Sequence, residues 1–146
     1  MRLLCIVLCF VTTLFPVNAV VAAKKLSVEY QYEKALSKAQ QEDKILLLLT
    51  VKENCYWCDK IIDHSFTHVS VQKELQKFVT VIIDRDGIYP QVFKEDFSPA
   101  IFYIDPKTQK SFYESIGYID AASLLNDLYD AQSMRENRIE GKRRGK

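Results

Sequence analysis

The run Ile45–Val51, with the sequence ILLLLTV, restricts the fold more than any other segment of this 146-residue chain. It has the length of a β-strand, and polar residues lie on both sides of it. Because side chains alternate between the two faces of a sheet, a strand that is apolar throughout must be covered on both faces. The run therefore predicts a strand inside a sheet that has helices packed on each side.

Apolar spacing elsewhere predicts that helices and strands alternate along the chain. Helical spacing is found in the segments 28–39, 58–66, 71–78 and 121–128, and one further turn of helix is expected at 92–96. Further strands are predicted at 79–83, 100–104 and 111–116, the last two joined by a turn. Strands separated by helices should pair in parallel, whereas the closing hairpin is antiparallel. The expected fold class is α/β, with a central mixed β-sheet flanked by helices on both faces, in one domain over 26–133.

The N-terminal segment has the pattern of a secretory signal peptide. Residues 3–23 carry no charge, Arg2 precedes them, and Lys24 follows. The strongly apolar part, 3–15, is shorter than the roughly 20 residues that a membrane-spanning helix needs. We expect a signal peptide over 1–19, with cleavage after Ala23 as a second candidate and an uncleaved membrane anchor as the alternative. The predicted location is the bacterial periplasm, with a membrane-anchored form if the signal stays attached.

Charge is distributed unevenly, although the formal net charge is only +1. This balance leaves no overall field to attract nucleic acid, so no nucleic-acid partner is expected. From Arg135 to Lys146 there are six basic and two acidic residues. We expect residues 134–146 to form a basic, solvated C-terminal tail. Binding of this tail to anionic lipid or to an acidic partner is the alternative.

Two of the four cysteines lie in the predicted signal peptide, which leaves Cys55 and Cys58 in the exported chain. One Cys-x-x-Cys pair offers no disulfide framework, so the pair is redox-active, binds a metal or forms a lone structural bridge. Cys55 falls between the strand 45–51 and a predicted helix, where free backbone N–H groups and the helix dipole favour a thiolate. A thiolate attacks a substrate disulfide, and a second thiol one turn away resolves the mixed disulfide.

His64 and His68 raise the question of a metal site. Together with the cysteines they give the order Cys-x2-Cys-x5-His-x3-His, which invites comparison with zinc sites. The interval between the two pairs is much shorter than in zinc fingers, and His64 lies about two turns beyond Cys58 on the same predicted helix. The four side chains cannot converge without breaking that helix. We therefore predict no metal site and no organic cofactor.

The segment NCYWCDK, residues 54–60, and the triplet Ser98-Pro99-Ala100 before a strand together resemble the thioredoxin superfamily. The resemblance covers roughly residues 28–131 and is closest to exported, periplasmic thioredoxin-like proteins. It implies a thioredoxin fold with Cys55 as the catalytic nucleophile and Cys58 as the resolving cysteine.

The same resemblance assigns a substrate-binding surface around the cysteine pair. It implies a cis peptide bond before Pro99, which together with Ser98 would line the substrate groove. Tyr56 and Trp57 lie between the two cysteines and are expected to be exposed and to contact the substrate, as aromatic anchors at interfaces do.

Two features depart from the thioredoxin pattern. Thioredoxin has Gly-Pro between its cysteines where this chain has Tyr56-Trp57, and this dipeptide tunes the reduction potential. Thioredoxin also has a buried acid six residues before the first cysteine, where this chain has Leu49. Either water or another group, with Glu53 as one candidate, would then take the proton of Cys58, or the resolving step is slower.

The resemblance implies an exported thiol–disulfide oxidoreductase, for which reduction of client disulfides is the favoured direction. Its expected partners are client proteins with disulfides or thiols and a membrane-bound electron relay that re-reduces the pair; a monomer is expected. The alternative is a non-catalytic protein on a thioredoxin scaffold that binds a metal or a partner through the same cysteines.

Overall fold

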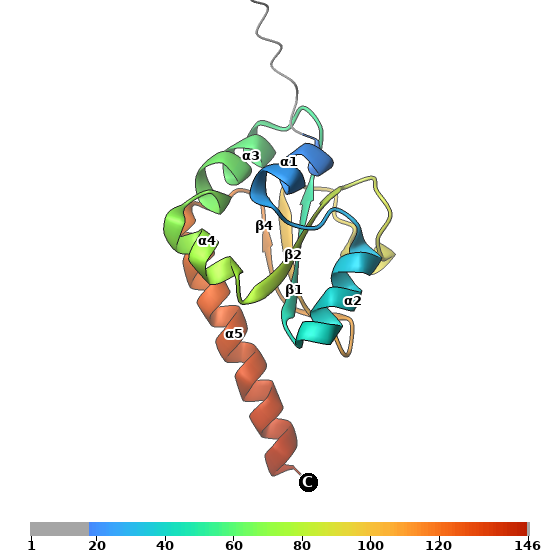
Figure 1. Ribbon diagram of the computed structural model, residues 1–146, viewed down its shortest axis with the longest axis vertical. Helices are drawn as coiled ribbons and strands as arrows, with labels where there is room; N and C mark the ends of the chain where they lie inside the picture. The colour runs from blue at the N-terminus through green and yellow to red at the C-terminus, as the bar shows by residue number, and fades with distance from the viewer. Residues whose placement is uncertain (1–17, 146) are drawn as a thin grey trace, which may run out of the picture.

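The computed structural model describes residues 18–145 and is built around a four-stranded mixed sheet (Figure 1). The strand order is β2-β1-β3-β4, so the apolar strand β1 (Ile45–Val51) lies inside the sheet. It pairs in parallel with β2 (Phe78–Asp84) and antiparallel with β3 (Ala100–Asp105). β3 and β4 (Lys110–Ile116) then form an antiparallel hairpin. The predicted α/β class with a mixed sheet is confirmed.

Alternate residues of β1 face two hydrophobic cores, one on each side of the sheet. Leu46 and Leu48 face the smaller core, beneath α2 (Tyr32–Glu42) and the 3₁₀ helix η2 (Gln91–Phe93). Leu47 and Leu49 face the larger core. The elements that cover it are α1 (Ala19–Leu26), α3 (Tyr56–Lys60), the π-helical turn η1 (Ile61–Phe66), α4 (Val69–Leu75) and α5 (Ala121–Arg144). Every residue of β1 is buried, as its apolar sequence predicts.

Helix α1 belongs to the folded domain, although the predicted domain boundary at residue 26 leaves it out. Asn18 caps it by accepting the N–H of Val21 at 2.9 Å, and α1 contributes the buried residues Ala19, Ala22, Ala23 and Leu26 to the larger core. Lys25 on its outer side pairs with Asp63 of η1 at 2.7 Å. Both predicted cleavage positions fall within α1; the rest of the predicted signal peptide, 1–17, lies outside the described residues.

Several helix boundaries differ from the predicted ones. α2 begins at Tyr32 and not near Val28, because Glu29 is extended and bridges Val81 at the edge of β2. Phe78 starts β2 and is not part of the helix before it. The helix after Cys55 changes to π-helical pairing at Ile61, and the turn predicted at 92–96 is η2.

The basic C-terminal segment, expected as a solvated tail over 134–146, is largely exposed and forms the end of helix α5. Leu124, Leu128 and Ala131 are buried against the larger core, and the helix then continues to Arg144 and projects from the body (Figure 1). Arg135 holds it to the C-cap of α2 by an ion pair with Asp43 at 2.8 Å. Of the helices in residues 18–145, none combines the length and the apolar character that crossing a membrane requires.

Candidate active site

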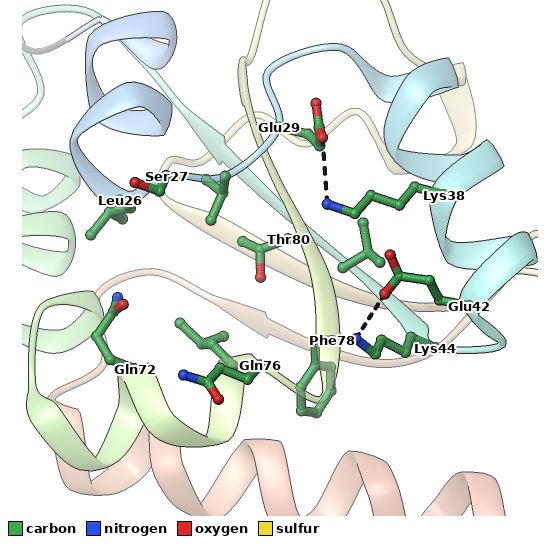
Figure 2. Close-up of a pocket in the computed structure, with 13 residues that line it drawn as sticks. Leu26, Ser27, Glu29, Lys38, Glu42, Lys44, Gln72, Gln76, Phe78 and Thr80 are labelled. Carbon is green, nitrogen blue, oxygen red and sulfur yellow. Dashed lines mark ion pairs between the residues drawn. The ribbon is translucent and has the colours of Figure 1, made fainter.

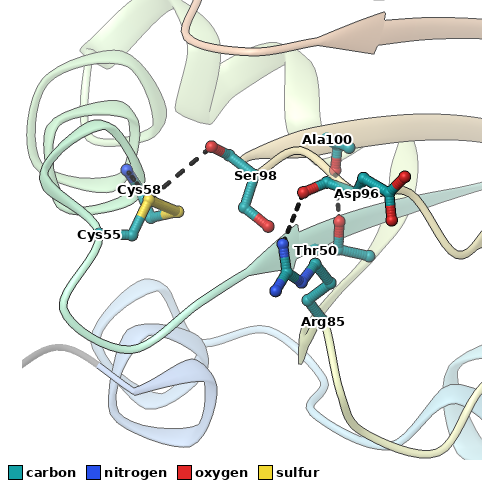
Figure 3. Close-up of a disulfide and its surroundings, with 7 residues drawn as sticks. All are labelled: Thr50, Cys55, Cys58, Arg85, Asp96, Ser98 and Ala100. Carbon is teal, nitrogen blue, oxygen red and sulfur yellow. Dashed lines mark hydrogen bonds between the residues drawn. A yellow bond between two sulfur atoms is a disulfide. The ribbon is translucent and has the colours of Figure 1, made fainter.

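The two cysteines of the Cys-x-x-Cys pair form a disulfide where β1 ends and α3 begins (Figure 3). Their Cα atoms are 5.2 Å apart. Cys55 is the N-cap of α3, and its sulfur accepts the backbone N–H of Cys58 at 3.2 Å. Cys58 is only 1% exposed, whereas Cys55 is partly exposed. An incoming sulfur atom can therefore approach Cys55 and not Cys58.

A tight turn of polar residues places Cys55 at the helix start. The chain leaves β1 through Lys52 and Glu53, and Asn54 takes a left-handed backbone conformation with φ +57°. Asparagine tolerates this conformation better than most residues do. The turn places the sulfur of Cys55 at the start of α3, where it accepts the N–H of Cys58 and where the helix dipole stabilises negative charge.

The loop before β3 lies directly against the disulfide (Figure 3). The Ser98–Pro99 bond is cis, as the resemblance implied, and Pro99 is buried. The carbonyl oxygen of Ser98 is 3.8 Å from the sulfur of Cys55. The Ser98 hydroxyl is buried and has no hydrogen-bond partner. This loop therefore borders the partly exposed sulfur of Cys55.

Hydrogen bonds hold the loop in this position from both ends. The N–H of Gly117, just after β4, donates to the carbonyl of Pro99 at 2.8 Å. The hydroxyl of Thr50 on β1 donates to the carbonyl of Ala100 at 3.4 Å. The guanidinium group of Arg85 donates to the carbonyl of Asp96 at 2.6 Å. The loop thus has a fixed position relative to the disulfide.

Tyr56 and Trp57 are exposed, by 67% and 49%, as predicted for residues inside the pair. The ring of Trp57 packs on that of Tyr118, with centroids 5.3 Å apart, and on that of Tyr56 at 5.0 Å. The ammonium group of Lys60 lies 5.1–5.8 Å from the centroids of all three rings. Tyr118 was not identified from the sequence, and Lys60 entered there only as the last residue of the segment NCYWCDK.

An apolar groove opens beside the loop and the disulfide. It has a volume of about 450 Å³ and is lined by Trp57, Phe97, Ser98, Ile116, Gly117 and Tyr118. Three of these large apolar side chains, Trp57, Phe97 and Ile116, are exposed to solvent. Gly117 has a φ of +92°, a conformation that favours glycine and turns the chain at the end of β4. The groove joins Trp57 and Ser98, the substrate-binding residues predicted from the sequence.

An apolar side chain occupies position 49, where thioredoxin has a buried acid. Leu49 is fully buried between Ile82 of β2 and Ile101 of β3. Glu53, the candidate considered from the sequence, is exposed in the turn before Cys55. Asp59 directly follows Cys58, and burial together with the nearby carboxylate of Asp63 raises the pKa of Asp59.

The two histidines are exposed and lie on different elements. His64 is in η1, and His68 is the N-cap of α4. Within residues 18–145, no group of three or more His, Cys, Asp or Glu side chains is placed to hold a metal ion. The Cys-Cys-His-His series therefore does not come together as one cluster.

A second cavity, of about 380 Å³, lies at the edge of β2 (Figure 2). Ion pairs flank it: Lys38 lies 3.7 Å from Glu29, and Lys44 lies 2.7 Å from Glu42. The hydroxyl of Thr80 is buried in its wall without a partner. Its lining includes neither the cysteines nor any of the neighbouring residues Tyr56, Trp57, Ser98 and Pro99, so the cavity lies apart from the disulfide.

The sheet order, the disulfide at a helix start and the cis-proline loop define a thioredoxin-fold protein with a Cys-x-x-Cys pair. Residues 22–99 match the family model Thioredox_DsbH, described as "Protein of unknown function, DUF255". The chain belongs to this DsbH-like, thioredoxin-related family. No curated protein matches the sequence.

Solved structures with the same fold include a thioredoxin from Thermus thermophilus, at 20% identity and a TM-score of 0.62, covering 82% of this chain and 94% of that one. A protein named DsbH Oxidoreductase has 16% identity and a TM-score of 0.55, covering 71% and 83%. The reduced DsbD C-terminal domain of Neisseria meningitidis has 14% identity and a TM-score of 0.58, covering 68% and 92%. At these identities the likeness concerns the fold.

Proposed function

We propose that the protein is an exported thiol–disulfide oxidoreductase that reduces disulfides of client proteins. The unequal exposure of the two cysteines carries this proposal. Cys55 is accessible and lies at the start of a helix, whereas Cys58 is buried behind it. A structural disulfide would need no such asymmetry, and a loop this small adds little stability.

In the proposed reaction the reduced pair supplies two electrons. The Cys55 thiolate attacks one sulfur of the client disulfide, forming a mixed disulfide and releasing the other client sulfur as a thiolate that takes up a proton. Cys58 then loses its proton and attacks the sulfur of Cys55. This step closes the Cys55–Cys58 disulfide, the state seen in the structure, and releases the second client sulfur as a thiol.

Tyr56, Trp57, Ser98 and Pro99 are proposed to bind the client next to the reacting sulfur. The groove beside the loop offers apolar surface to a client side chain. Ser98 lines this groove, and its carbonyl oxygen lies 3.8 Å from the sulfur of Cys55, so its backbone is placed beside the reacting atom.

The direction of electron flow, the periplasmic location and re-reduction by a membrane-bound relay are parts of the same proposal. The uncharged segment 3–23 supports export, and the similarity to DsbH and DsbD structures supports exchange with protein partners. The reduction potential tests the direction. A value near about −270 mV supports a reductase, and one near about −120 mV shows an oxidant.

Two serine variants test the roles of the cysteines. Cys55→Ser should abolish reduction of protein and small-molecule disulfides, because no accessible thiolate remains. Cys58→Ser should accumulate mixed disulfides with clients, because the resolving thiol is missing. Mass spectrometry of non-reduced samples measures both. Full activity of the Cys55→Ser variant would overturn the proposal.

A further inference from the structure

The Lys60 ammonium group is held by aromatic rings beside the disulfide. Tyr56, Trp57 and Lys60 lie on α3 at spacings of three and four residues, which puts them on one side of the helix. Tyr118 reaches the same place from the end of β4. The faces of the three rings stabilise the cation by cation–π attraction.

This cation has no carboxylate partner within residues 18–145. None of the ion pairs in this range includes Lys60. Asp59 is the acidic residue of the same helix, and its carboxylate lies near that of Asp63. Asp63 in turn forms an ion pair with Lys25 of α1 and not with Lys60. The rings fix the position of the Lys60 charge but leave its charge uncompensated, so an incoming carboxylate finds a positioned partner.

Two rings join the cation to the groove. Trp57 and Tyr118 contact Lys60 and also line the apolar groove next to Ser98. A client segment bonded to Cys55 therefore meets two features next to each other: the apolar groove that these rings line, and the positive charge of Lys60 that the same rings hold. Charge and apolar surface at fixed positions select a partner by its sequence.

We infer that Lys60 determines client specificity, favouring disulfides whose cysteine has an acidic residue beside it and an apolar residue that enters the groove. This inference rests on the proposed function, because it concerns the substrate of the same disulfide. The contact is partly exposed to solvent, so we expect a preference of about twofold to fivefold from one ion pair.

The test uses short peptides that differ at one residue. Each contains one cysteine, as a mixed disulfide with 2-thiopyridine, and a phenylalanine; the residue beside the cysteine is glutamate, glutamine or lysine. Two series place this residue before or after the cysteine. Reaction with the reduced Cys58→Ser variant forms the peptide–Cys55 disulfide and releases 2-thiopyridone, whose absorbance gives the rate.

With Lys60 present, the glutamate peptide of at least one series should react fastest and the lysine peptide slowest. Lys60→Gln should make the three rates equal, and Lys60→Glu should reverse their order. Lys52→Glu is the matched control, because Lys52 is an exposed lysine three residues before Cys55 and outside the ring cluster. Reversing the charge at position 52 should leave the order of the peptide rates unchanged. High salt should reduce the preference.

The outcomes separate the two claims. If neither the peptides nor a small neutral disulfide, hydroxyethyl disulfide, reacts with the reduced wild-type protein, the proposed function fails. If all of them react but the peptide rates in both series are the same with and without Lys60, only the inference about Lys60 is overturned. The same holds if Lys52→Glu changes the order of the peptide rates as much as Lys60→Glu does.

Discussion

The groove beside the disulfide and the cavity at the edge of β2 have similar volumes, about 450 and 380 Å³. They differ in whether the lysine side chains next to them form ion pairs with acidic residues of the same chain. At the cavity, Lys38 and Lys44 pair with Glu29 and Glu42 of the same wall (Figure 2). At the groove, aromatic rings are exposed and the neighbouring cation has no acidic partner in the described chain. Exposed aromatic rings beside a cation without an internal partner mark the surface that we expect to bind another molecule.

The largest expected effect comes from a polar group placed in the sheet interior. Leu49→Asp should lower the free energy of unfolding by at least about 3 kcal/mol, because an unpaired carboxyl would be buried between β2 and β3. Leu49→Met, which keeps the volume and the apolar character, should cost less than about 1.5 kcal/mol. Urea titration measures both. Equal stability of the two variants would show that water reaches this position.

The features that the sequence could predict are those set by local chemistry. The strand 45–51 is buried because all of it is apolar, and a cysteine between a strand and a helix can only occupy the helix start. The exposure of Trp57 follows from its place inside the pair. These expectations needed no knowledge of how distant segments pack.

The features that the sequence could not predict depend on such packing. Ala19, Ala22 and Ala23 suit the end of a signal peptide as well as the buried side of a short helix, so α1 was missed. Tyr118 meets Trp57 only because the end of β4 lies beside the cis-proline loop. The basic segment after Arg135 lacks an apolar stripe, yet it continues α5 because the helix is already anchored upstream.

A smaller effect is expected at the groove itself. Trp57→Ala should slow reduction of a protein client about tenfold, because an aromatic anchor at an interface supplies more than about 1 kcal/mol. Reduction of hydroxyethyl disulfide should stay nearly unchanged, since so small a substrate does not need the ring. Tyr129→Ala on α5, at an equally exposed aromatic residue, is the control and should change neither rate. A large loss of thermal stability in Trp57→Ala, with both rates falling together, would make Trp57 a packing residue.

The smallest effect is expected at the cavity. Thr80→Val removes a buried hydroxyl that has no partner, so the free energy of unfolding should stay equal or rise by up to about 1 kcal/mol. Thr50→Val removes a buried hydroxyl that donates to Ala100, and it should lower the free energy of unfolding by about 1 kcal/mol. Calorimetry compares the two. A clear destabilisation by Thr80→Val would show that this hydroxyl does have a partner, such as a bound water.

The central claim is that Cys55 is the reactive thiol of the pair and Cys58 the protected one. Brief alkylation of the reduced protein near neutral pH, followed by mass spectrometry of its peptides, tests this claim most directly. Because Cys55 is accessible at the helix start and Cys58 is 1% exposed, the first label should fall on Cys55. A first label on Cys58, or equal labelling of the two cysteines, would contradict the assignment of their roles.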